Sequence, residues 1–315
     1  MKIDELRNKE AECALPLDYV FYQHTKVIEG MVQDINKIYL SIELPKEIEE
    51  PYDYSMLQRE TSCKDDKMLV SLLNFPIPTI QIHSKGFQGL KQIHTPYAPC
   101  DCSFHLTGAE SKELTKKIIR WCKIYGYPFR LSECKQEINL ALQTKKRTGE
   151  CDSTDNHIMV KLYGKEFMFK LWKLKECLLL LDFYTDHPSR EKYNQFSENM
   201  DKKSRLPYEY YHDNYIEILK NIAEQIKFST SLSFKDDKSA FFKVITESPF
   251  DTAFYQLFLI YLFKGDNHRI RQCQYCGKFF KAKNSRSRYC DNAACNRKSY
   301  YAAKHRKNNK QKAAD

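Results

Sequence analysis

The sequence predicts an α+β protein in two parts, a mostly α-helical body over residues 1–263 and a small cysteine-rich module over residues 264–315. Three observations predict this division. Apolar residues recur with a helical period through much of the first part, and only short runs have the character of strands. Four of the twelve cysteines stand close together in the second part. Charge divides in the same way, because the second part carries 15 lysines and arginines against three acids.

The N-terminal region is predicted to begin with a helix followed by short strands. Residues 25–40 carry apolar side chains at a helical spacing, and Pro45 would end that helix. Residues 69–73 and 77–82 are short apolar runs broken by prolines, and such runs are typical of strands.

The rest of the body is predicted to be mainly helical. Thr107 precedes Glu110 by three residues, which is the spacing of a capping box, and Gly126 would end the helix that this box begins. The further predicted elements are a helix over 132–144 with Ile138, Leu140 and Ala141 inside, a strand over 158–162, an apolar helix over 166–184, a charged loop over 185–207, a helix over 211–226 and a buried helix to residue 263 with Asp251 as its cap.

The cysteines of the module have the spacing of a metal site. Cys273, Cys276, Cys290 and Cys295 read C-x2-C, thirteen residues, then C-x4-C. Two such thiol pairs can surround one zinc ion as a tetrahedron, and four thiolates leave no position for water, so the zinc would be structural. Binding of this kind contributes about 10–16 kcal/mol, so the module is expected to fold only with its metal. Four free thiols, a redox C-x-x-C pair and His305 as a substitute ligand are the alternatives.

The residues between the cysteines predict a β-hairpin followed by a helix, as in a treble clef or a zinc ribbon. Gly277 permits a tight knuckle after the first pair. Residues 279–280 form a strand, with one of the two phenylalanines covering the metal, and residues 288–289 lead back to the second pair. Asp291 or Asn292 would cap the helix that carries the last cysteine.

The charge of the module indicates an anionic partner. Residues 264–315 have a net charge of +12, and the rest of the chain sums to −2. Such an asymmetry is typical of proteins that bind nucleic acid. The alternative is that the lysines and arginines only keep a small domain soluble while its tyrosines pack on the body. The candidate nucleic-acid-binding residues are Lys281, Lys283, Arg286, Arg288, Arg297, Lys298, Tyr301, Lys304 and Arg306.

The C-terminal segment resembles a known zinc finger. The residues that carry the likeness are Arg269, Arg271, Phe280, Asn284, Ser285, Arg286, Arg288, Cys290 and the run Cys295, Asn296, Arg297. On these residues the segment is similar to the CGNR family, a treble-clef type of finger at the C-terminus of many bacterial proteins. It departs from that family in its narrow first cysteine pair and in lacking a glycine after Cys295. The resemblance implies zinc binding and a role in DNA binding or transcriptional control, and it implies no enzyme activity.

Other groups of polar residues in the chain give weaker evidence of a functional site. The chain has none of the usual signatures of phosphate-binding loops, dinucleotide sites, serine hydrolases or zinc proteases, so no catalytic residue is assigned. A second cluster has no recognised ligand spacing and predicts a turn: His94, Cys100, Cys102 and His105. Polar residues at the end of the long apolar helix fit a cleft or a solvated helix end equally well: Asp182, His187 and Arg190.

The sequence favours a cytoplasmic protein that does not enter a membrane. The first residues contain no apolar segment typical of a signal peptide, and the longest apolar runs fall short of the ~18 residues of a membrane span. A zinc-finger protein that contacts nucleic acid is therefore expected, and the expected role is that of a bacterial regulator whose body senses or recruits a protein partner. The alternatives are an interaction scaffold with a purely structural zinc site, and an enzyme that acts on nucleic acid.

Overall fold

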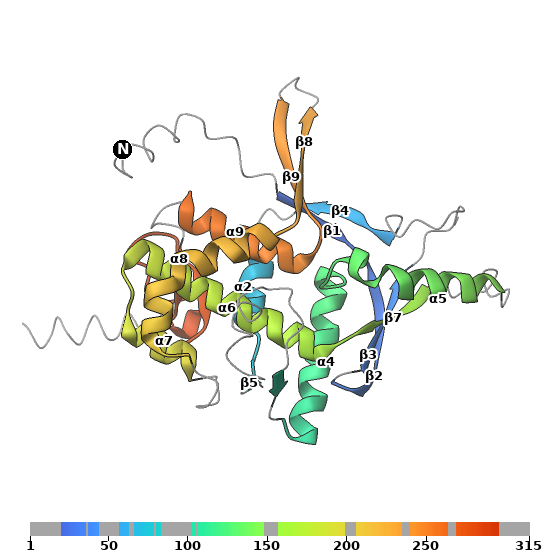
Figure 1. Cartoon of the computed structure of the whole chain (residues 1–315), viewed down its shortest axis with the longest axis horizontal. Coiled ribbons are helices and arrows are strands. Elements are labelled where there is room, and N and C mark those ends of the chain that lie inside the picture. Colours follow the sequence, from blue (N-terminus) through green and yellow to red (C-terminus); the bar gives the residue numbers. More distant parts are fainter. Residues whose placement is uncertain are drawn as a thin grey trace, which may run out of the picture.

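The structure is a computed structural model that describes residues 20–35, 37–43, 57–62, 66–78, 80–82, 102–104, 106–147, 157–198, 206–234, 240–263 and 269–295. Within these residues, helices are combined with several small sheets, as the sequence predicts (Figure 1). In chain order the elements are β1 (Val20–His24), β2 (Val27–Asp34), β3 (Lys37–Glu43), β4 (Arg59–Ser62), α2 (Lys67–Leu73), β5 (Ile80–Ile82), β6 (Cys102–Phe104), α4 (Gly108–Tyr125), η4 (Leu131–Cys134), α5 (Lys135–Arg147), β7 (His157–Leu162), α6 (Gly164–Asp186), α7 (Arg190–Ser197), α8 (Tyr208–Gln225), β8 (Phe228–Phe234), β9 (Ala240–Thr246), α9 (Pro249–Leu262), β10 (Ile270–Gln272) and β11 (Phe279–Lys281).

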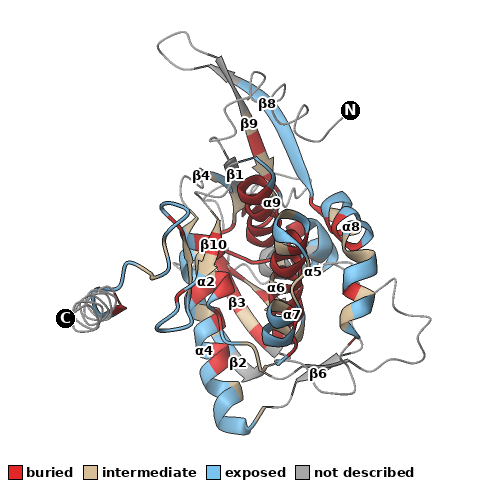
Figure 2. Ribbon diagram, turned by 90° about the vertical axis from the view of Figure 1, so that its left-hand side faces the viewer, coloured by how far each residue is buried: buried red, intermediate tan, exposed pale blue. Residues whose placement is uncertain are grey.

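The helices α6 and α9 form the buried centre of the body and are largely red in Figure 2. Both are buried around most of their circumference, with α9 almost wholly apolar and α6 including the buried ion pair of Lys173 and Glu176. Aromatic rings join them, because the ring of Phe250 on α9 lies 5.3 Å from that of Phe167 on α6 and stacks at 6.0 Å on that of Phe129. The predicted apolar helices over 166–184 and up to 263 are confirmed.

The N-terminus of α9 corrects the predicted cap. Ser248, and not Asp251, is the cap. The Ser248 hydroxyl accepts a hydrogen bond of 3.1 Å from the backbone amide of Asp251, in the first turn of the helix. Asp251 is fully buried and instead accepts two hydrogen bonds from Arg130, of 2.8 Å from Nε and 2.6 Å from Nη2. This bidentate pair joins α9 to the segment before η4. Its two residues are 121 positions apart in the chain.

The helix α4 begins and ends where the sequence predicts. The Glu110 amide donates to the Thr107 hydroxyl at 3.3 Å, and the Thr107 amide donates to the Glu110 carboxylate at 2.8 Å, which completes the capping box. Gly126 ends the helix with φ of +88°, and a Cβ at this position would lie 2.8 Å from the carbonyl oxygen of Thr25. Both the backbone conformation and the close approach therefore require glycine.

The predicted helix over residues 25–40 is wrong. These residues form β2 and β3, which pair antiparallel, and β3 pairs in turn with β7, the strand predicted over 158–162. Ile38, Leu40 and Ile42 are all completely buried, which is the period of two expected of a strand. The apolar spacing of this segment fits both periods, and strand pairing on both sides of β3 decides between them.

Two further segments differ from the prediction in type. Residues 69–73 belong to the helix α2, where Met68, Leu69, Leu72 and Leu73 are buried along one face. The charged segment 185–207 contains α7, which Ser189 caps by accepting a hydrogen bond from the amide of Lys192. Both helices are too short to show a clear helical period in the sequence. Packing against α6 stabilises them.

The strands β1, β4, β8 and β9 were not predicted, and they form one sheet in the order β4-β1-β9-β8. The hairpin of β8 and β9 projects from the body at the top of Figure 1. The helix predicted over 132–144 is present as η4 and α5, but Leu140, expected inside, is 65% exposed. The predicted helix over 211–226 corresponds to α8.

Among the described residues, no helix combines the length and the apolar character that crossing a membrane would require.

Candidate metal centre

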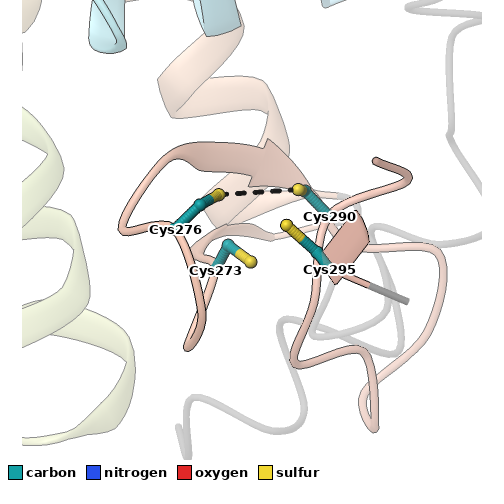
Figure 3. Close-up of side chains that lie close together, drawn as sticks. All are labelled: Cys273, Cys276, Cys290 and Cys295. Atoms are coloured by element: carbon teal, nitrogen blue, oxygen red, sulfur yellow. Dashed lines mark hydrogen bonds between the residues drawn. The ribbon is translucent and has the colours of Figure 1, made fainter. Parts of the chain in front are cut away.

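The first cysteine pair lies on a tight turn between β10 and β11. The amide of Cys273 donates to the carbonyl of Lys278 at 2.8 Å, and the amide of Gly277 donates to the carbonyl of Cys273 at 2.9 Å. Gly277 has φ of +69°, the conformation that the sequence predicts for the knuckle. The turn thus presents Cys273 and Cys276 on the same side of the hairpin (Figure 3).

The predicted hairpin is only partly correct. Residues 279–281 are a strand, but their partner is β10, which precedes the first cysteine, and residues 288–289 are not part of a strand. Phe279 packs against the core of the body, so this phenylalanine joins the module to the body.

The second cysteine pair is held by side-chain caps. The Asn284 side chain accepts a hydrogen bond from the amide of Arg286 at 3.0 Å and so closes the turn after β11. The Asn292 side chain accepts one from the amide of Ala294 at 2.9 Å, and residues 293–295 are helical. Of the two predicted caps, Asn292 rather than Asp291 therefore begins the turn that carries Cys295.

The four cysteine sulfurs converge on one point, as Figure 3 shows. All lie within 4.8 Å of one another, and those of Cys276 and Cys290 are 3.7 Å apart. Zinc–sulfur bonds of about 2.3 Å in a tetrahedron place the sulfurs about 3.8 Å from each other, so the spacing fits a zinc ion. The thiols are not joined as disulfides. This is the one group of potential metal ligands that the described ranges bring together.

The environment shifts the pKa values of the clustered thiols in opposite directions. Burial alone would raise the pKa of Cys273, but backbone hydrogen bonds from Cys276, Cys290 and Tyr275 lower that pKa to about 6. Burial and the neighbouring thiols raise the pKa of Cys295 to about 12. Four thiolates this close repel one another, and a divalent cation among them removes that repulsion. A redox pair is not favoured, because the first two cysteines lie on a hairpin turn and not at a helix N-terminus.

The module contacts the body through both polar and charged groups. The Asn74 amide side chain at the end of α2 donates to the carbonyl of Phe279 at 2.8 Å and accepts from its amide at 2.7 Å. These two bonds extend the edge of β11 onto α2. Lys281 forms an ion pair with Asp66, and the Tyr261 hydroxyl donates to the carbonyl of Ile270 at 3.2 Å.

The candidate nucleic-acid-binding residues fall into three groups. Lys281 and Lys283 are paired with carboxylates, Lys281 with Asp66 of the body and Lys283 with Asp291 at 3.0 Å. Arg286 and Arg288 are exposed. Five others lie outside the described residues: Arg297, Lys298, Tyr301, Lys304 and Arg306.

The structure describes the side chains of only one of the two other candidate groups, the polar residues at the end of α6. The second cluster of histidines and cysteines, residues 94–105, has no described side chains. Asp182 lines a cleft between the body and the module, together with Lys175 and Arg271. Arg190 points elsewhere and pairs with Glu209 at 2.6 Å, and His187 does not line the cleft. No motif in the sequence signals this cleft, because Lys175 is one of several lysines of α6.

No protein-family model, curated protein or solved structure matches the chain. The likeness of the module to the CGNR finger therefore depends on its own residues.

Proposed function

We propose that the C-terminal module holds one structural zinc ion through Cys273, Cys276, Cys290 and Cys295, and that it contacts nucleic acid through its exposed basic residues. The convergence of the four sulfurs within 4.8 Å is the observation that supports the metal site most strongly. When bound, zinc supplies a dication that holds the two cysteine pairs together. The residues of the module do the rest, because Gly277 and Asn292 shape the two turns that present the thiols.

The charge of the module supports the nucleic-acid contact. Even with two charges subtracted for a zinc ion bound to four thiolates, residues 264–315 keep a net charge of about +10. Arg286 and Arg288 are exposed on the loop between the cysteine pairs, free of the carboxylates that neutralise Lys281 and Lys283. A transcriptional regulator is the proposed biological role, with the body as the part that senses a signal.

Salt-titrated binding to duplex DNA and to RNA tests this contact. The variant Arg286→Ala/Arg288→Ala and the variant Arg297→Ala/Lys304→Ala/Arg306→Ala should each weaken binding while keeping one zinc per chain. Each lost phosphate contact should reduce the salt slope by about 1. The matched control is Lys112→Ala/Lys116→Ala/Arg120→Ala, which removes three exposed positive charges from α4. If the control weakens binding as much as the module variants do, the contact is not made by the module.

A second function is favoured by a specific observation. The Asn74–Phe279 hydrogen bonds and the Lys281–Asp66 ion pair hold the module against the body. Such contacts are expected of an element whose zinc ion has a structural role only. If the zinc ion only holds the module on the body, the protein is an interaction scaffold. It would then bind zinc but show no salt-dependent retention of DNA or RNA.

A further inference from the structure

A cleft of about 750 Å³ lies where the module meets the body. One wall comes from α2, α6 and α7, and the other from β10, β11 and the cysteine knuckle. This volume lies within the range of about 300–1,000 Å³ that small-molecule sites occupy. Apolar side chains from both sides line it, among them Phe75, Leu178, Phe196 and Phe279.

Lys175 places a poorly satisfied positive charge in this cleft. Its ammonium nitrogen lies 3.4 Å from the carbonyl oxygen of Phe75, which is a long hydrogen bond. No carboxylate of the described residues forms an ion pair with it. Burial lowers the pKa of Lys175 to about 8, and no neighbouring charge opposes that effect. Lys175 is partly buried. A partly buried ammonium without an anion is disfavoured, and a bound anion would reduce that cost.

The other charges of the cleft leave it positive. Its two carboxylates, Asp182 and Asp186, are already matched, because Lys192 lies 3.3 and 3.4 Å from them and Arg269 pairs with Asp186. Arg271 and the exposed Lys278 also line the cleft, and Arg271 is fixed by donating to the carbonyl of Ser285 at 2.7 Å. Neither forms an ion pair with a described carboxylate. Three cations that line the cleft therefore have no anionic partner among the described residues: Lys175, Arg271 and Lys278.

We propose that this cleft binds a small organic anion, in which a phosphate or carboxylate pairs with Lys175 and an apolar ring system lies between Phe75, Phe196 and Phe279. Both walls would contact such a ligand, since one belongs to the body and the other to the module. Binding would therefore favour the module in its docked position on the body. The site stands on its own geometry and does not depend on contact with nucleic acid.

Calorimetric titration of the full-length, zinc-loaded protein tests the proposal with four probes. These are 1-naphthyl phosphate, 1-naphthoate, the neutral 1-naphthalenemethanol and inorganic phosphate. At least one of the two naphthyl anions should bind, and comparison of the two identifies the preferred anionic group. The neutral alcohol and inorganic phosphate should each bind at least about tenfold more weakly than that anion, because the alcohol lacks the charge and phosphate lacks the ring.

The variant Lys175→Met tests the residue directly. Methionine keeps the length and the apolar stem of the side chain, and the affinity for the naphthyl anion should fall at least about tenfold with one charge-assisted hydrogen bond lost. The matched control Lys220→Met removes an exposed lysine of α8 and should bind as the native protein does. Thermal unfolding verifies that both variants are folded. The proposal is overturned if neither anion binds at millimolar concentration, if the alcohol binds equally, or if Lys175→Met retains full affinity.

Discussion

The body and the module are held together in different ways. The body has two helices, α6 and α9, whose side chains are buried over most of their surface and stack aromatic rings between them. The module has a two-stranded sheet of three-residue strands, and Cys273 and Cys295, each 2% exposed, are among its few buried side chains. A segment this small buries too little apolar surface to fold by itself. On the proposed function, a zinc ion would provide in the module what the hydrophobic core provides in the body.

Removal of the metal should separate the two regions most strongly. Chelation should unfold the module, because sites of this kind contribute about 10–16 kcal/mol to folding. Hydrogen exchange should then become fast over 270–295 and stay slow in α6 and α9. Cys295→Ser should have the same effect without a chelator. Cys122→Ser, in the core of the body, is the control and should keep its zinc. Equal loss of protection in both regions would show that they are one cooperative unit.

The reverse experiment breaks the body. Phe250→Ala removes a fully buried ring that contacts those of Phe129 and Phe167, and it should destabilise the body by about 3–5 kcal/mol in urea unfolding. Leu262→Ala at the exposed end of the same helix should cost far less, since this side chain is 42% exposed. The zinc content of both variants should remain unchanged under native conditions. A destabilisation below about 1 kcal/mol for Phe250→Ala would contradict the assigned core.

The cleft between the regions predicts a dependence of stability on pH. In the unfolded chain Lys175 keeps its proton up to about pH 10.5, whereas in the folded protein it loses that proton near pH 8. Between these values the unfolded state binds more protons, so the contribution of Lys175 to the free energy of unfolding rises with pH. Lys175→Met should therefore be more stable than the native protein at pH 7, by about 1–3 kcal/mol, and this advantage should shrink as the pH rises from 8 to 10.5. An advantage that is constant with pH would show that the ammonium is not desolvated.

The smallest effect is expected at the polar contact between the regions. Asn74→Ala removes two hydrogen bonds to the backbone of Phe279, and docking of the module should weaken by about 1–2 kcal/mol. Faster hydrogen exchange of β11 at constant zinc content would report this change. Ser71→Ala on the same helix is the control for the loss of a polar side chain away from the module, because Ser71 contacts Trp121. Exchange of β11 that is equal in both variants would mean that other contacts fix the module.

The sequence predicts best those features that are local. The capping box of Thr107 and Glu110, the apolar helix α6 and the spacing of the four cysteines each lie within a short segment. The apolar spacing of residues 25–40 fits both a helix and a strand. Pairing of β3 with β2 and with β7, which lies more than a hundred residues away, selects the strand. The hairpin of β8 and β9 was missed because serines and threonines dominate β8.

The cleft could not be found from the sequence for the same physical reason. It brings Phe75, Lys175 and Arg271 together from segments about a hundred residues apart, and none of them belongs to a recognisable motif. The cysteine cluster is predicted from the sequence because its four members are also close along the chain, at a spacing typical of metal sites.

Metal content and coordination of the purified full-length protein test the central claim most directly. Elemental analysis combined with X-ray absorption at the zinc edge should find one zinc per chain, surrounded by four sulfurs at about 2.3 Å. Protein that is fully folded at residues 270–295 without bound metal, or zinc bound through ligands other than these four thiolates, would contradict it.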